Sequence, residues 1–138
     1  MRIMAIDYGD AHTGIAISDP TGLLAGFTTV INSRRQEVVV EQVTLLAKEH
    51  GAEELVLGHP VNMDGTLGPR SEKAKAMKAL LEEAPALPVV LWDERRTTID
   101  AHNILFNSGK NAKQRKKVVD AVAASLILEG YLTFKKSH

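Results

Sequence analysis

The chain has 138 residues, 44% of them hydrophobic, which is the size of one domain and enough apolar side chain for one core. Basic and acidic residues number 17 each, so the formal net charge is zero, and cysteine is absent. This composition excludes disulfide scaffolds, thiolate zinc sites and cysteine nucleophiles, and it is compatible with a reducing cytoplasm. No run approaches the roughly 20 apolar residues of a membrane helix, and we expect a single cytoplasmic domain over residues 1–138.

Three strands are predicted at the start of the chain, over residues 2–7, 13–19 and 23–31. Their short links favour an antiparallel meander. The elements that follow alternate between helix and strand. In chain order we expect a helix that ends at Gly51, a strand over 54–58, a loop over 59–69, a helix over 69–83 with Ala74, Met77, Leu80 and Leu81 inward, a strand over 89–92, a helix over 97–106, a polar mobile segment over 107–117 and a largely buried helix over 118–134.

Strands that are separated by helices pair in parallel, whereas the first three strands pair antiparallel. The predicted fold class is therefore α/β, a mixed five-stranded sheet with helices on its faces.

Charge is unevenly distributed along the chain. Residues 1–104 hold 10 basic and 15 acidic side chains, whereas residues 105–138 hold 7 and 2. A basic end beside an acidic body favours contact with a polyanion, although a solvated charge run explains it about as well. Aromatic residues are scarce here, so capture of single strands by base stacking is not supported. The basic residues expected to grip nucleic-acid phosphates are Lys110, Lys113, Arg115, Lys116 and Lys117.

A carboxylate, Asp7, closes the first strand, and a turn that contains Gly9 leads into the second strand near Gly14. The carboxyl ends of parallel strands border ligand crevices, and a glycine lets a phosphate or metal approach the backbone. A hairpin turn with an aspartate explains the pattern equally well. Asp10 is expected to be a turn residue.

Acids also follow the predicted strand over 89–92. Asp93 and Glu94 are adjacent, so strand alternation sends them to opposite faces. Arg95 and Arg96 can hold phosphates or pair with local acids, and Thr97 or Thr98 can cap a helix.

Asp120 lies on the last helix, where small residues such as Ala123 and Ala124 allow a close approach to the sheet. A salt bridge to Lys116, or exposure in the first helical turn, also explains a charge at this position. If the helix brings Asp120 to Asp7 and Glu94, the three acids require a cation, and oxygen ligands favour Mg²⁺ or Mn²⁺.

The chain resembles the YqgF/RuvX family in four segments that occur in the same order. They are residues 5–9 (AIDYG) with Gly14, 58–65 (GHPVNMDG), 93–98 (DERRTT) and 119–124 (VDAVAA). The family consists of small bacterial proteins with a ribonuclease H-like fold, described as Holliday-junction resolvases and as nucleases for the 5′ end of pre-16S ribosomal RNA. The resemblance runs from residue 2 to about residue 134.

The resemblance implies that Asp7, Glu94 and Asp120 are the catalytic, metal-binding acids, with Asp93 as the alternative occupant of the second place. We predict that Glu94 faces the site, because its longer side chain reaches an ion from the strand end, and that Asp93 holds the turn. The resemblance also implies a role on this face in binding substrate or supporting the loop for Asn62, Asp64, Arg70, Arg95 and Thr98.

One position departs from the pattern of related junction resolvases, which carry a glutamate at the end of the fourth strand. This chain has Gly58 and His59 there, and a loop histidine is a simpler explanation of His59 than a metal ligand. The leading hypothesis is a nuclease for pre-16S ribosomal RNA, acting as a monomer or homodimer. The alternatives are a Holliday-junction resolvase for branched DNA, a catalytically weak nucleic-acid-binding module and, least favoured, a nucleotide phosphotransferase, which needs two such domains.

Overall fold

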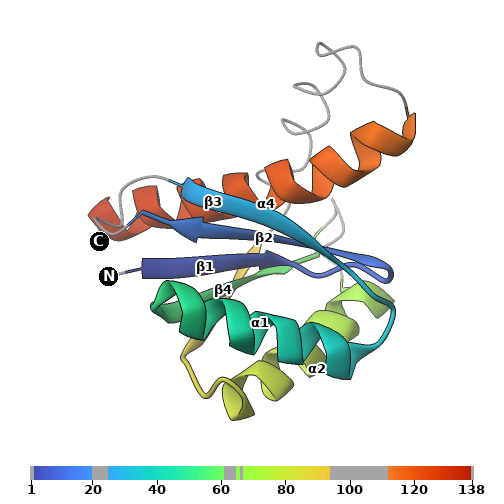
Figure 1. Ribbon diagram of the computed structural model, residues 1–138, viewed down its shortest axis with the longest axis horizontal. Coiled ribbons are helices and arrows are strands. Elements are labelled where there is room, and N and C mark those ends of the chain that lie inside the picture. The colour runs from blue at the N-terminus through green and yellow to red at the C-terminus, as the bar shows by residue number, and fades with distance from the viewer. Residues whose placement is uncertain (1, 20–24, 61–64, 66, 94–111, 138) are drawn as a thin grey trace.

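The computed structural model describes residues 2–19, 25–60, 65, 67–93 and 112–137 (Figure 1). The described elements comprise a five-stranded sheet and three helices. In chain order they are β1 (Arg2–Asp7), β2 (His12–Ser18), β3 (Ala25–Asn32), α1 (Gln36–His50), β4 (Ala52–His59), α2 (Pro69–Glu83), β5 (Val89–Asp93) and α4 (Ala112–Ser137).

The strand order across the sheet is β3-β2-β1-β4-β5. The pairs β1/β2 and β2/β3 are antiparallel, and the pairs β1/β4 and β4/β5 are parallel. The predicted mixed sheet is therefore confirmed. Helices α1 and α2 cover one face of the sheet and α4 covers the other (Figure 1). We call these the α1/α2 face and the α4 face.

Local sequence signals correctly predicted the end of α1 and both ends of α2. α1 ends at Gly51, whose φ of 69° is the left-handed conformation that a glycine adopts without steric cost. α2 covers 69–83 as predicted, and Pro69 occupies its first turn, where a missing N–H costs nothing. Of the four residues expected inward on α2, Ala74, Met77 and Leu81 are buried, but Leu80 is 36% exposed, so that part of the prediction is wrong.

The last helix differs from the prediction in two respects. It begins at Ala112, so residues 112–117, expected in a polar mobile segment, are helical. The run has no apolar stripe and therefore resembles a loop in the sequence, but Lys, Arg and Gln are good helix formers, and here they extend the helix. Over residues 121–135, where burial is described, the buried side chains also form one stripe rather than most of the surface: Ala123, Ala124, Ile127, Leu128, Tyr131 and Leu132. The helix predicted over 97–106 lies outside the described residues.

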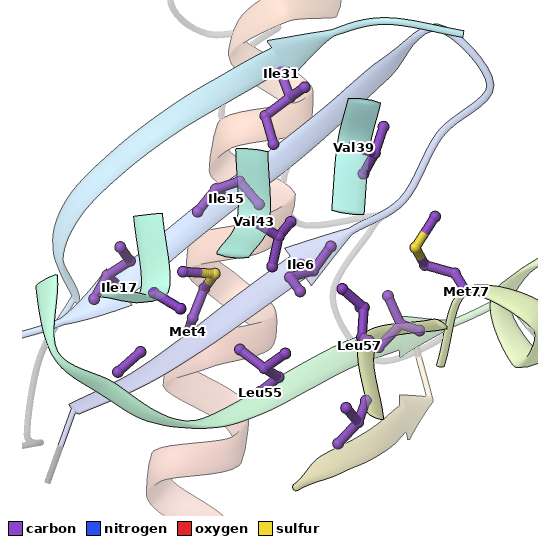
Figure 2. Close-up of a cluster of buried hydrophobic side chains, with 14 of the residues drawn as sticks. Met4, Ile6, Ile15, Ile17, Ile31, Val39, Val43, Leu55, Leu57 and Met77 are labelled. Carbon is purple, nitrogen blue, oxygen red and sulfur yellow. The ribbon is translucent and has the colours of Figure 1, made fainter. Parts of the chain in front are cut away.

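Alternation along the strands builds one core on each face of the sheet. On the α1/α2 face, Met4 and Ile6 of β1 pack with Leu55 and Leu57 of β4 and with Met77 of α2 (Figure 2). Each fully buried side chain of this size contributes about 1.5–3 kcal/mol. The smaller core on the α4 face contains Ile3, Ala5, Ala16, Val56, Ala124, Ile127, Leu128, Tyr131 and Leu132.

Contacts near its C-terminal end fix the direction of α4. Lys135 Nζ lies 3.3 Å from Glu54 Oε1, and Glu54 is next to the start of β4. Burial raises the pKa of Tyr131, and the nearby Glu54 carboxylate raises it further. The end of α4 therefore lies at the amino ends of β1 and β4, and its earlier turns run toward their carboxyl ends (Figure 1).

The turn between β1 and β2 requires a glycine because the backbone closes tightly on itself. A Cβ added at Gly9 would collide with the carbonyl oxygen of His12. We expect Gly9→Ala to lower the free energy of unfolding by about 2–3 kcal/mol, the cost of overpacking against backbone that cannot move aside. Chemical denaturation measures it. The matched control is Gly51→Ala, where nothing lies within 4 Å and only the positive φ opposes a side chain, at about 1 kcal/mol. A smaller loss for Gly9→Ala than for the control would contradict the prediction.

Candidate active site

Three parallel strands end at one edge of the sheet, and each ends in a chemically active side chain. These residues are Asp7 of β1, His59 of β4 and Asp93 of β5. Ile6 pairs with Leu57, and His59 pairs with Asp93, so the three strand ends are nearly level. This carboxyl edge is where ligands bind in sheets of this kind.

Asp7 belongs to the α4 face. Ile3 and Ala5 pack in the core under α4, and alternation places Asp7 on the same side. Its neighbours on the adjoining strands are both glycines: Gly14 is paired with it on β2, and Gly58 follows the partner of Ile6 on β4. No side chain on either neighbouring strand therefore stands beside this half-buried carboxylate, which leaves its oxygens accessible to a cation or a phosphate.

Asp93 belongs to the opposite face. Val89 and Leu91 pack with the core under α1 and α2, so alternation places Asp93 on that side. Trp92 lies between Leu91 and Asp93 in the strand and so points to the other face. It packs under α4, where Gly130 comes close to its ring. The sheet therefore separates the Asp93 side chain from Asp7.

His59 is the last residue of β4 and not part of the following loop, which corrects the predicted boundary. It shares the α1/α2 face with Asp93, its neighbour in register. Its Nε2 lies 2.6 Å from Oγ of Ser71, a fully buried residue in the first turn of α2. This hydrogen bond ties α2 to the carboxyl edge. Ser71 was missed in the sequence because a serine near a helix start resembles an ordinary capping residue.

A group of charged residues surrounds the turn after β1. Asp10 lies in that turn, as expected, and its Oδ1 accepts a hydrogen bond of 2.8 Å from Lys73 Nζ. That bond and the charge of Lys73 lower the pKa of Asp10, with smaller contributions from Arg70 and Arg34. The predicted substrate residue Arg70 is exposed, in the first turn of α2, and its charge acts on Asp10 in this turn.

Other predicted site residues fall where the structure gives no side chain. Residues Asn62, Asp64, Glu94, Arg95, Thr98 and Lys110 lie outside the described ranges. The backbone of α4 carries Lys113, Arg115, Lys116, Lys117 and Asp120, without described side chains. Within the described part of the chain, no three His, Asp or Glu side chains are grouped closely enough to hold a metal ion.

None of the described helices is long and apolar enough to span a bilayer.

The fold is shared with solved structures of RuvC. Thermus thermophilus RuvC in complex with a Holliday-junction substrate matches with a TM-score of 0.63 over 99% of this chain and 96% of that one, at 13% identity. The large terminase nuclease of the thermophilic phage G20c matches with a TM-score of 0.55 over 91% and 80%, at 10% identity. The sheet, its strand order and the described helices therefore define a RuvC-like, ribonuclease H-like fold.

Sequence comparison is more specific. The profile of the RuvX family, described as Holliday junction resolvase, matches residues 1–134, and the chain belongs to this family. A relative from Halothermothrix orenii is 43% identical over 135 residues, 98% of this chain and 96% of its own length. Another from Geobacillus kaustophilus is 41% identical over 138 residues, 99% and 100% of the two chains. Both carry the name "Putative pre-16S rRNA nuclease". The predicted family is confirmed.

The link between His59 and Ser71 provides a test of how the carboxyl edge is held. We expect Ser71→Ala to lower the free energy of unfolding by about 1–3 kcal/mol, because it leaves a partly buried imidazole nitrogen without its partner. Denaturant titration measures this loss. The double variant His59→Leu/Ser71→Ala removes both polar groups and is expected to regain part of the stability, as paired apolar replacements do. Equal stability of Ser71→Ala and the unmodified protein would show that the bond contributes nothing.

Proposed function

We propose that this protein is a metal-dependent nuclease that hydrolyses phosphodiester bonds at the 5′ end of pre-16S ribosomal RNA in the cytoplasm. The observation that carries the proposal is the position of Asp7, a carboxylate at the carboxyl edge between Gly14 and Gly58, open to a ligand on the α4 face. Support for the substrate comes from full-length relatives at about 40% identity that are named for this activity.

Asp120 is the proposed second acid. The buried stripe of α4 contains Ala124 and Ile127, and position 120 precedes them by four and seven residues, a spacing that returns to the same side of a helix. Since α4 runs toward the carboxyl ends of β1 and β4, position 120 is about one turn nearer to that edge than Ala124. This placement supports a role beside Asp7.

Glu94 is the proposed third acid. Asp93 has the parity of the α1/α2 face, so the next residue of an extended chain would have the parity of Asp7. The assignment of Asp93 as a metal ligand loses support for the same reason. Asp93 is instead proposed to support the strand end beside His59.

A divalent cation fits the proposed donor set of Asp7, Glu94 and Asp120, because hard oxygen ligands suit Mg²⁺ and Mn²⁺. When bound, such an ion lowers the pKa of a water molecule and stabilises the leaving oxygen of a phosphodiester. The contribution of the protein is to hold the carboxylates that bind the cation in a fixed position. Asp7 extends from a rigid backbone because β1 is buried on both faces. The glycines beside it, Gly14 and Gly58, carry no side chain and so leave room for the phosphate.

Basic residues of the C-terminal region are proposed to hold substrate phosphates without reading sequence. Arg95, Thr98 and Lys110 would act before α4, and the helix itself carries Lys113, Arg115, Lys116 and Lys117 within its first six residues. Arg70 is proposed to act from the first turn of α2.

A second candidate is resolution of branched DNA, which the description of the RuvX family and the fold shared with RuvC favour. Comparing the cleavage of a four-way DNA junction with the cleavage of a 5′-extended precursor RNA by the same preparation distinguishes the two substrates.

A catalytically weak binding module is favoured only by His59, which stands where related resolvases carry a carboxylate. A phosphotransferase is not favoured, since this chain matches only 35% of a Thermus thermophilus hexokinase, at a TM-score of 0.50.

Asp7→Asn tests the proposed site directly. We expect a loss of cleavage of at least a hundredfold in Mg²⁺ or Mn²⁺, with unchanged melting temperature and RNA affinity, because an amide fills the same space without the charge. Initial rates on the precursor RNA measure the effect. The control is Glu49→Gln, the same chemical change on an exposed residue near the far end of α1. Cleavage within about tenfold of the unmodified rate, ~1.4 kcal/mol, would exclude Asp7 from the active site.

Asp93 and Glu94 are distinguished by a pair of single substitutions. We expect Glu94→Gln to lose metal-dependent cleavage at nearly normal stability. Asp93→Asn should lower the melting temperature first, because its face of the sheet is the one that packs on α2. Both variants are scored for cleavage and for melting temperature. The reverse pattern would exchange the two roles, and equal loss of cleavage in both would mean that both acids reach the site.

A further inference from the structure

A polar cavity of about 370 Å³ opens at the carboxyl edge on the α1/α2 face. Its lining residues come from the turn between β1 and β2, from the start of α1 and from α2. The starts of α1 and α2 and this turn lie on the same side of the molecule in Figure 1. Tyr8 forms its apolar wall and packs against the core below. The charged residues that line the cavity are Asp10, Arg34, Arg35, Glu37 and Lys73.

Positive charge is in excess around this cavity. Lys73 is paired with Asp10 at 2.8 Å and Arg35 with Glu37 at 2.7 Å, and all four side chains are more than half exposed. Among the described residues, neither Arg34 nor Arg70 makes a hydrogen bond or an ion pair.

Arg34 and Arg70 are both close enough to Asp10 to lower the pKa of that carboxyl. Arg70 and Lys73 are three residues apart on α2 and so share one side of the helix. Three cations from two separate segments therefore surround one turn.

We infer that this cavity binds a backbone phosphate of the nucleic-acid substrate, held by Arg34 and Lys73 of its lining and by Arg70, which lies outside the lining one turn before Lys73 on α2. The inference rests on the proposed function and adds to it a second contact surface on the opposite face from Asp7. A guanidinium fork matches two phosphate oxygens, and exposed ion pairs such as Lys73–Asp10 are weak enough for a phosphate to replace the carboxylate.

The geometry gives the path of the bound strand. Asp7 and Asp10 are three residues apart, so their backbones are separated by no more than about 11 Å. Asp7 faces α4 and the cavity faces α1 and α2, so a strand that reaches both crosses the sheet edge over the turn that contains Gly9. The cavity then holds a phosphate within a few nucleotides of the bond at Asp7.

The test is the salt dependence of binding by the double variant Arg34→Ala/Arg70→Ala, measured with fluorescently labelled precursor RNA and a DNA of the same sequence. We expect affinity to fall about tenfold and the slope of log K against log salt to decrease by about 0.7–0.9, which corresponds to the one phosphate contact proposed for the cavity. The matched control is Lys48→Ala/Lys78→Ala, which removes the same charge from later turns of α1 and α2. It is expected to leave the slope within about 0.3 of the unmodified protein.

An unchanged slope in Arg34→Ala/Arg70→Ala, or a decrease equal to that of the control, would overturn the inference. Circular dichroism and melting temperature confirm that the variants are folded. Asp10→Asn gives an independent arm, because removing the competing carboxylate is expected to tighten binding two- to fivefold, and weaker binding would count against the cavity. If the salt slope decreases only with RNA, or only with DNA, the result identifies which nucleic-acid backbone the cavity binds.

Failure of this inference and failure of the proposed function give different results. If Asp7→Asn still cleaves, the proposed active site is wrong whatever the salt slopes show. If Asp7→Asn is inactive but the arginine variant binds normally, the active site stands and the cavity does not hold substrate. When both proposals are right, the arginine variant raises KM and leaves kcat on saturating RNA within about threefold of the unmodified protein.

Discussion

The burial of β1 on both faces is the constraint on which the rest of this molecule depends. Met4 and Ile6 pack under α1 and α2, while Ile3 and Ala5 pack under α4, and all four are at most 2% exposed. Neighbouring strands β2 and β4 occupy both of its edges. A strand held from four sides cannot shift register without moving apolar side chains to the wrong face. Asp7 therefore emerges from a strongly constrained backbone at the carboxyl edge, where sheets of this kind bind ligands.

The same alternation divides the carboxyl edge into two chemical environments. The α4 face presents Asp7 between two glycines, whereas the α1/α2 face presents His59 and Asp93, with Ser71 fixed to the imidazole. Asp7 and Asp93 end strands whose ends are nearly level, but they serve different sides of the sheet. The first environment is open to a ligand, and the second holds the start of α2 in place.

The hydrogen bond of His59 explains why this chain can carry a histidine at the end of β4, where related resolvases carry a glutamate. A glutamate at this position would bring a negative charge to the carboxyl edge, but His59 is engaged by a buried serine hydroxyl. The position has a structural role here, and it cannot be counted as a missing ligand alone. Catalysis by this chain would then depend on Asp7 with acids from beyond β5 and from α4, and on phosphate contacts that orient the substrate without reading its sequence.

The sequence by itself determined the order of the elements, because apolar periodicity and the terminators Gly51 and Pro69 are local signals. It also marked Asp7 and the adjacent glycines, since four motifs in a fixed order identify the family. The tertiary structure alone decided that Asp93 and Asp7 face opposite ways, because facing depends on which helix packs on each side. It also decided the pairing of His59 with Ser71 and the gathering of Arg34, Arg70 and Lys73 around Asp10. These residues are far apart in sequence, and only the packing of α1 and α2 against one sheet edge brings them together.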